Sequence, residues 1–96
     1  MVVQVSADVQ SDAAHQPAVV ADISRHGCRV SGFGGRVTVG APVTLRPAGL
    51  EAVTAWVRWT EGRDVGLEFA RPLTAPAFDY LAQRHGVSVE FPGLAA

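Results

Sequence analysis

The chain has 96 residues and a mass of 10.1 kDa, which allows one domain, because two halves would be too small to bury separate cores. Hydrophobic residues make up 48% of the sequence and charged residues 18%, so we expect a collapsed globule over residues 1–96 rather than a disordered chain. The net charge of -1 and the sequence pI near 6.2 do not provide the positive surface that phosphate backbones require. We therefore predict no DNA or RNA partner.

The single cysteine cannot form an intramolecular disulfide, and this favours a reducing compartment. The first residues lack the basic and apolar regions of a secretory signal, and no run of 18 apolar residues occurs. We therefore expect a cytoplasmic protein that does not insert into a membrane.

Alternation of apolar and polar residues indicates short β-strands over about residues 2–69. The clearest case is the first strand, in which Val3, Val5, Ala7 and Val9 alternate with polar residues. Six or seven strands at regular spacing predict an antiparallel all-β barrel or sandwich. The expected strands cover residues 3–9, 18–22, 28–31, 36–39, 43–45, 50–60 and 65–69.

Two tryptophans lie in the expected strand 50–60. The alternation places Trp59 on the same face as Val57, and Trp56 on the opposite face. Both tryptophans are typical of barrel core or helix-docking area. An exposed Trp56, Phe33 or helix face would instead suit a protein-interaction surface, since aromatic side chains are common binding anchors.

One helix follows the strands, over about residues 75–85. Thr74 is a suitable N-cap, Pro76 lies in the first turn, and Gly86 comes just after the end. Phe78 and Leu81 belong to an apolar stripe that can close one mouth of a barrel. The tail, residues 87–96, has alternating apolar residues that fit either an edge strand or simple packing.

Three segments in this order resemble the PilZ domains of bacteria, over about residues 19–81. These are six-stranded β-barrels with a carboxy-terminal helix that act as receptors for cyclic di-GMP. The segments that carry the resemblance are Asp22-Ile23-Ser24-Arg25-His26-Gly27, which fits the family's (Asp/Asn)-x-Ser-x-x-Gly signature, then Ala55-Trp56-Val57-Arg58-Trp59 and Gly66-Leu67-Glu68-Phe69.

The resemblance implies a nucleotide site at Asp22, Ser24 and Gly27, with Arg25 as a phosphate partner. A carboxylate at Asp22 can accept hydrogen bonds from the N1–H and N2–H of guanine, and Ser24 offers a hydroxyl. Gly27 lets the backbone approach closely or adopt a positive φ. The same residue types also stabilise ordinary turns, so a purely structural role is the alternative.

The chain departs from the family pattern at its beginning. PilZ receptors carry an Arg-x-x-x-Arg motif just before the first strand, and only Met1 precedes that strand here. Loss of two charge-assisted contacts weakens binding by about two to four orders of magnitude. Three interpretations follow: a protein-binding adaptor that does not bind nucleotide, a weak receptor in which Arg25, Arg29 or Arg71 substitute, or a receptor truncated at its amino terminus.

Other chemistries are poorly supported, and we predict a regulatory protein with a bacterial protein partner, no cofactor, no metal and no enzymatic activity. Asp22, Ser24 and His26 are the residue types of a hydrolase triad, but alternate positions of one turn do not form it. His26 and Cys28 have no further motif-spaced ligand for a metal site. The glycine-rich segment 32–35 lacks a following Lys-Ser/Thr or helix and indicates a hairpin loop.

Overall fold

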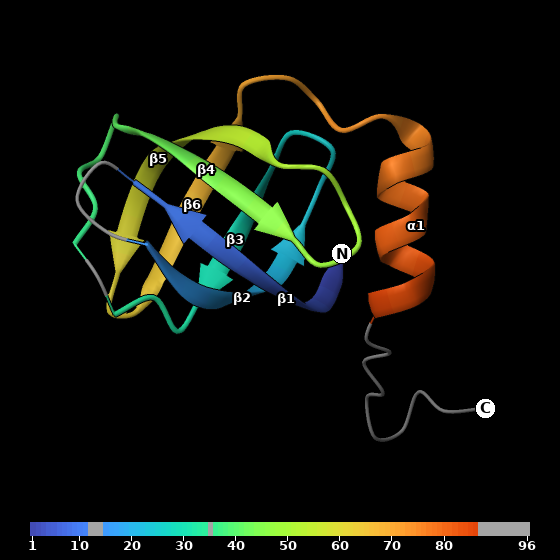
Figure 1. The fold of residues 1–96 in the computed structure, drawn as a ribbon, viewed down its shortest axis with the longest axis horizontal. Helices are drawn as coiled ribbons and strands as arrows, with labels where there is room; N and C mark the ends of the chain where they lie inside the picture. Colours follow the sequence, from blue (N-terminus) through green and yellow to red (C-terminus); the bar gives the residue numbers. More distant parts are fainter. Residues whose placement is uncertain (12–14, 35, 87–96) are drawn as a thin grey trace, which may run out of the picture.

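The computed structural model describes residues 1–11, 15–34 and 36–86. Six strands form a closed antiparallel barrel in the order β1-β2-β3-β6-β5-β4, and one helix covers an end of it (Figure 1). The predicted all-β barrel with a carboxy-terminal helix is therefore confirmed. The elements are β1 (Val2–Gln10), β2 (His15–Ile23), β3 (Gly27–Ser31), β4 (Pro42–Pro47), β5 (Val53–Glu61), β6 (Asp64–Phe69) and α1 (Ala75–His85).

The barrel interior is filled by the apolar residues that alternate along the strands. In β1 the side chains of Val3, Val5, Ala7 and Val9 are buried, while most of their neighbours face outward. Closure of the sheet leaves no free edge, so each strand is paired on both sides. The largest fully buried side chains are Leu45, Leu81, Val5, Val20, Val30 and Val57.

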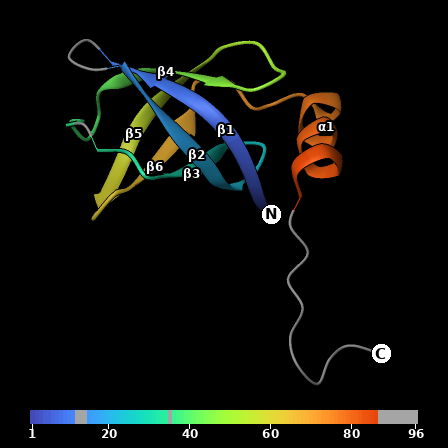
Figure 2. The same cartoon turned by 60° about the horizontal axis from the view of Figure 1, so that its bottom comes forward.

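Helix α1 closes one mouth of the barrel and lies beside the start of β1 (Figure 2). The Thr74 hydroxyl accepts a hydrogen bond from the Ala77 amide at 3.2 Å, as expected of an N-cap. Leu81 is only 1% exposed, because it inserts into the barrel core. At the helix end, Gly86 forms an isolated bridge with Val3. The expected range 75–85 matches the helix.

The connection between β3 and β4 differs from the prediction. The described residues among 36–39 are not a strand, and they belong to a loop at the barrel end opposite α1 (Figure 1). The chain turns at Gly32 and Gly40, whose φ angles are 78° and 91°. Positive φ values of this kind favour glycine over other residue types. Phe33 is 4% exposed, so it plugs the core and is not a surface anchor.

Strand β5 also differs from the prediction, because it begins at Val53 rather than Leu50 and contains a bulge. Val57 pairs with Leu67, but Trp59 pairs with the adjacent Gly66, so the register shifts by one residue at Arg58. The shift turns Trp59 to the outer face, where it is 42% exposed. The expectation that Trp59 shares the core face of Val57 was therefore wrong.

The tail at residues 87–96 lies outside the described residues, and so does Gly35 of the expected hairpin loop. The described residues contain no helix with the length and hydropathy needed to span a membrane.

Candidate functional site

A hollow of about 320 Å³ lies on the outside of the barrel, where the end of β2 and the start of β3 face the bulged part of β5. We call it the signature hollow, because it contains most of residues 22–27, the signature turn. Its lining residues are Met1, Asp22, Ile23, Ser24, Gly27, Cys28, Arg29 and Trp59.

Ser24 organises the signature turn itself. Its hydroxyl oxygen accepts hydrogen bonds from the backbone amides of His26 and Gly27, both at 3.2 Å. The Ser24 amide in turn donates to the Gly27 carbonyl at 2.9 Å. These bonds are typical of a serine-stabilised turn, so Ser24 fixes the shape of the hollow.

Gly27 is needed because the backbone of β6 passes very close to it. A Cβ at position 27 would lie 2.3 Å from the carbonyl oxygen of Leu67, a distance that side chains do not tolerate. The described glycines with positive φ do not include Gly27. Of the two reasons that the sequence offered for a glycine here, close approach therefore applies, and the neighbour is β6.

Asp22 presents a carboxylate at the mouth of the signature hollow. Its side chain is 51% exposed, and one oxygen lies 3.2 Å from the amino group of Met1. A register shift between Val20 and Asp22 in the pairing of β2 with β3 sets the local geometry at this end of the strand. The carboxylate remains accessible to a ligand that offers N–H donors.

Arg29 brings positive charge into the signature hollow from β3. Its Nη1 donates to a carboxylate oxygen of Asp64 at 3.2 Å, and the two side chains are 39% and 36% exposed. A guanidinium has five N–H donors, so this bond leaves others free for an anion. Arg29 is thus the arginine of the signature hollow.

Trp59 forms the wall opposite the signature turn, a role that the sequence reasoning missed. Its indole lies against Gly66 of β6, where a Cβ would be 2.1 Å from the indole nitrogen. Gly66 is paired with both Trp59 and Arg29, which places the indole and the guanidinium in neighbouring strand positions. The glycine in the otherwise regular strand pattern at 65–69 was the available signal, since such a glycine marks close approach of another group.

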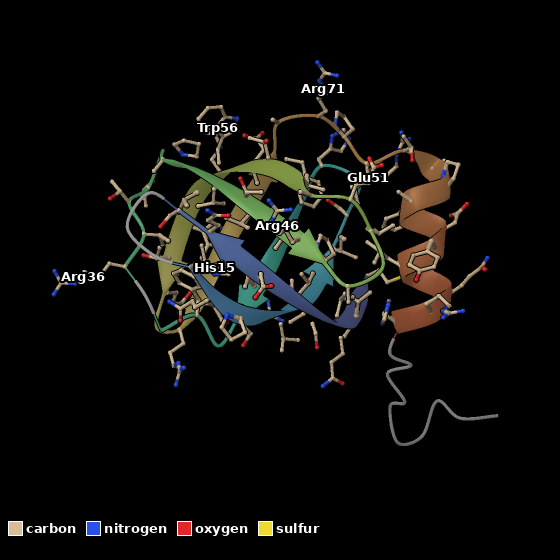
Figure 3. The ribbon with its side chains drawn as sticks, viewed as in Figure 1. His15, Arg36, Arg46, Glu51, Trp56 and Arg71 are labelled. Atoms are coloured by element: carbon tan, nitrogen blue, oxygen red, sulfur yellow. The ribbon has the colours of Figure 1, made fainter. Side chains whose placement is uncertain are left out.

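Arg25 and Arg71, the other two candidate phosphate contacts, do not line the signature hollow. Arg25 turns toward the segment between β6 and α1, where its Nε donates to the Leu73 carbonyl at 2.9 Å. Arg71 belongs to that same segment and projects away from the barrel (Figure 3). The structure therefore brings together Asp22, Ser24, Gly27 and Arg29, but separates them from these two guanidinium groups.

A larger groove of about 700 Å³ lies between the β4–β5 loop and the linker, residues 70–74. Its lining is mostly apolar, with Glu51 and Arg71 as the charged residues. The groove is formed by residues 50–54, 70–74 and Ala77. It contains none of the predicted site residues except Arg71.

The signature hollow offers no activated nucleophile. Burial raises the pKa of the Cys28 thiol from 9.0 to about 12, so the thiol stays protonated at neutral pH. Among the residues that the structure describes, no three histidine, cysteine or acidic side chains gather as a metal site. The chemistry present here is hydrogen bonding, charge and stacking, which suits ligand binding.

The fold is a small β-barrel domain, and the hollow on its outer wall is lined by charged and polar residues together with Trp59. The sequence model of the PilZ domain family matches residues 1–84. No curated protein is similar enough in sequence to give a match. Because the family match covers most of the chain, the protein belongs to the PilZ domain family, whose members are regulatory domains of cyclic di-GMP signalling rather than enzymes.

Proposed function

We propose that the protein is a non-enzymatic regulatory domain of bacterial cyclic di-GMP signalling, acting in the cytoplasm, and that it binds the nucleotide weakly through the signature hollow. One observation carries the proposal. The carboxylate of Asp22, the guanidinium of Arg29 and the indole of Trp59 line one hollow around the signature turn. These groups match the edge of guanine, a phosphate and a base face, respectively.

In the proposed complex, a guanine stacks on Trp59 and directs its N1–H and N2–H toward Asp22. Base-to-aromatic stacking contributes about 1 to 3 kcal/mol, and a carboxylate accepts both N–H groups. Ser24 already accepts two backbone hydrogen bonds, so its main role is to hold the signature turn. Gly27 allows the same turn to lie against β6.

Arg29 supplies the phosphate contact of the proposed site. Its bond with Asp64 holds the guanidinium in place, and the remaining N–H groups can face a phosphate oxygen. Arg71 projects elsewhere, and Arg25 would have to leave Leu73 before it could contact a phosphate. One arginine where the family pattern has a pair explains why the expected affinity is low.

The size of the signature hollow also favours weak binding. Ligand pockets usually measure about 300 to 1,000 Å³, and this one is near the lower limit at about 320 Å³. It accommodates one guanosine end of cyclic di-GMP, while the other end remains in solvent. Met1 lines the hollow, so arginines joined before Met1 would enter the hollow beside Asp22.

The second candidate function is a protein adaptor that binds no nucleotide. Trp56 is 37% exposed on the outer face of β5, and the apolar groove is large enough for side chains of a partner. A protein partner is compatible with either candidate. The two candidates differ in whether Trp59 responds to cyclic di-GMP.

Tryptophan fluorescence tests the proposal directly. In Trp56→Phe, Trp59 is the one indole of the chain, because the sequence has two tryptophans. We expect cyclic di-GMP to change its emission in a saturable way, with no change in the matched variant Trp59→Phe. An unchanged Trp59 signal at about millimolar ligand, where a complex of about -4 kcal/mol is half formed, would contradict the proposal.

A further inference from the structure

The signature turn is bonded directly to the linker that leads into α1. The Arg25 Nε donates to the Leu73 carbonyl at 2.9 Å, and the Leu73 amide donates back to the Arg25 carbonyl at 2.7 Å. One position further along the turn, the His26 carbonyl accepts from the Phe69 amide at 2.8 Å. Arg25 therefore holds the linker through both its side chain and its backbone.

Leu73 is the point at which three parts of the molecule meet. Its side chain is 8% exposed and packs in the core cluster that includes Leu81 of α1. It also lines the groove. The next residue, Thr74, caps α1. A displacement of Leu73 would thus change the wall of the groove and the start of the helix together.

The bond between Arg25 and Leu73 joins a charged donor to a neutral acceptor. A phosphate oxygen is a stronger partner for a guanidinium than a peptide carbonyl, because both groups of the pair are then ionised. Arg25 belongs to the signature turn, between Ser24 and Gly27, which both line the signature hollow. The Arg25 side chain points toward the linker and not into the hollow, so its guanidinium can reach a phosphate bound there only by leaving the Leu73 carbonyl.

We propose that Arg25 is an anion-sensitive latch: it holds the linker while the signature hollow is empty and releases the Leu73 carbonyl when a ligand phosphate takes its guanidinium. The latch rests on the proposed function for its ligand. It has two states with different contacts, which is what a ligand needs to shift an equilibrium. Opening of the latch would change the shape of the groove and the attachment of α1.

Two substitutions separate the charge of Arg25 from its ability to donate a hydrogen bond to the Leu73 carbonyl. In Arg25→Gln, the side-chain amide nitrogen is attached to Cδ, as Nε is in arginine, so it can donate to the Leu73 carbonyl but carries no charge. Arg25→Ala removes the donor as well. Arg71→Ala is the matched control, since it removes one arginine from the linker without touching the turn.

Hydrogen exchange of the Leu73 amide in the free protein tests the hold on the linker. We expect exchange to be about tenfold faster in Arg25→Ala, in keeping with the loss of one charge-assisted hydrogen bond. Arg25→Gln and Arg71→Ala should stay close to the wild type. Equal exchange in Arg25→Ala and Arg71→Ala would overturn the latch.

The same amide, followed by NMR with added cyclic di-GMP, tests the coupling. We expect the Leu73 signal to shift and its exchange to accelerate in the wild type, and neither to change in Arg25→Gln while Trp59 still responds. By linkage, the factor by which bound nucleotide favours the open latch equals the factor by which an already open latch changes nucleotide affinity. A Trp59 response without a Leu73 response in the wild type would overturn the latch alone. If neither responds, the proposed function fails and the coupling fails with it, while exchange in the free protein still decides whether Arg25 holds the linker.

Discussion

The groove and the signature hollow, two concave regions of this barrel, differ in both size and chemistry. The groove beside the linker is the larger, at about 700 Å³, and its lining is mostly apolar, whereas the signature hollow measures about 320 Å³ and combines a carboxylate, a guanidinium and an indole. A search by size alone would choose the groove, since large apolar pockets are the usual ligand sites. Under the proposed function, the nucleotide site is therefore indicated by convergent polar groups and not by volume.

The two regions are also connected, because they share the segment between the signature turn and α1. Arg25 of the turn bonds to Leu73, and Leu73 lines the groove. In the proposed account, the signature hollow recognises the ligand and the groove responds.

The largest effect should come from adding the missing arginines to the signature hollow. We expect an Arg-x-x-x-Arg segment joined before Met1 to tighten cyclic di-GMP binding by about two to four orders of magnitude, since two charge-assisted contacts are gained. Calorimetry measures the change, and an Ala-x-x-x-Ala segment of the same length is the control. Equal affinities for the two extended chains would show that residue 1 does not lead into the site.

Removal of the Asp22 carboxylate should have the next largest effect. We expect Asp22→Ala to weaken cyclic di-GMP binding about a hundredfold, because a guanine edge then loses its charged acceptor. Asp79→Ala, which removes an exposed acid from α1, is the control for net charge. Binding that is the same in both variants would exclude Asp22 from the site.

The signature turn can be displaced without altering any polar side chain. In Gly27→Ala the new Cβ would meet the Leu67 carbonyl, so we expect a loss of about 2 kcal/mol in unfolding free energy and a melting temperature lower by about 10 °C. Gly34→Ala is the control, because its nearest neighbour would be at an ordinary 3.5 Å. Thermal unfolding measures both variants, and similar melting temperatures would contradict the close approach at Gly27.

The two tryptophans offer a direct comparison within one strand. We expect Trp59→Ala to weaken cyclic di-GMP binding about tenfold through loss of stacking, and Trp56→Ala to leave it unchanged. Both residues are similarly exposed, at 42% and 37%, so general surface effects should be alike. An equal loss in both variants, measured by calorimetry, would argue against a specific stacking role.

The smallest effect near neutral pH concerns Cys28 at the base of the signature hollow. Its pKa is about 12 in the folded protein and 9.0 when exposed, so the unfolded chain loses the proton first. Stability should therefore be unaffected below pH 9 and should fall above it, by about 1.4 kcal/mol per pH unit. Denaturant unfolding at pH 8 and pH 10 measures the slope, and Cys28→Ala should remove this contribution. An identical slope in that variant would contradict the thiol assignment.

The sequence predicts the barrel well because alternation is a local property. The buried residues of β1 and the N-cap of α1 at Thr74 are predicted from residues close to them in the sequence, and the structure has both. The prediction of a strand at residues 36–39 was wrong, because alternation over a few residues cannot show whether a partner strand exists. The bulge at Arg58 was also hidden, since a register shift depends on β6, and it moved Trp59 from the core face to the signature hollow.

The predicted site residues illustrate the same limit. The signature identifies Asp22, Ser24 and Gly27, but not the partners that each residue finds in the fold. Arg25 and Arg29 are four residues apart, yet one bonds Leu73, 48 positions away, and the other bonds Asp64, 35 positions away. Such distant partners decide which guanidinium lines the signature hollow, and no local pattern contains that information.

Calorimetric titration with cyclic di-GMP at low ionic strength, with GTP as the control ligand, tests the central claim most directly, because low salt preserves weak phosphate contacts. The account predicts saturable heat with a dissociation constant between about 10 μM and 1 mM, and weaker binding of GTP. It also predicts that Asp22→Ala binds cyclic di-GMP about a hundredfold more weakly under the same conditions. No heat from the wild type at about millimolar ligand, or equal heat from Asp22→Ala, would contradict a nucleotide site in the signature hollow and would leave the protein-adaptor function as the explanation of this fold.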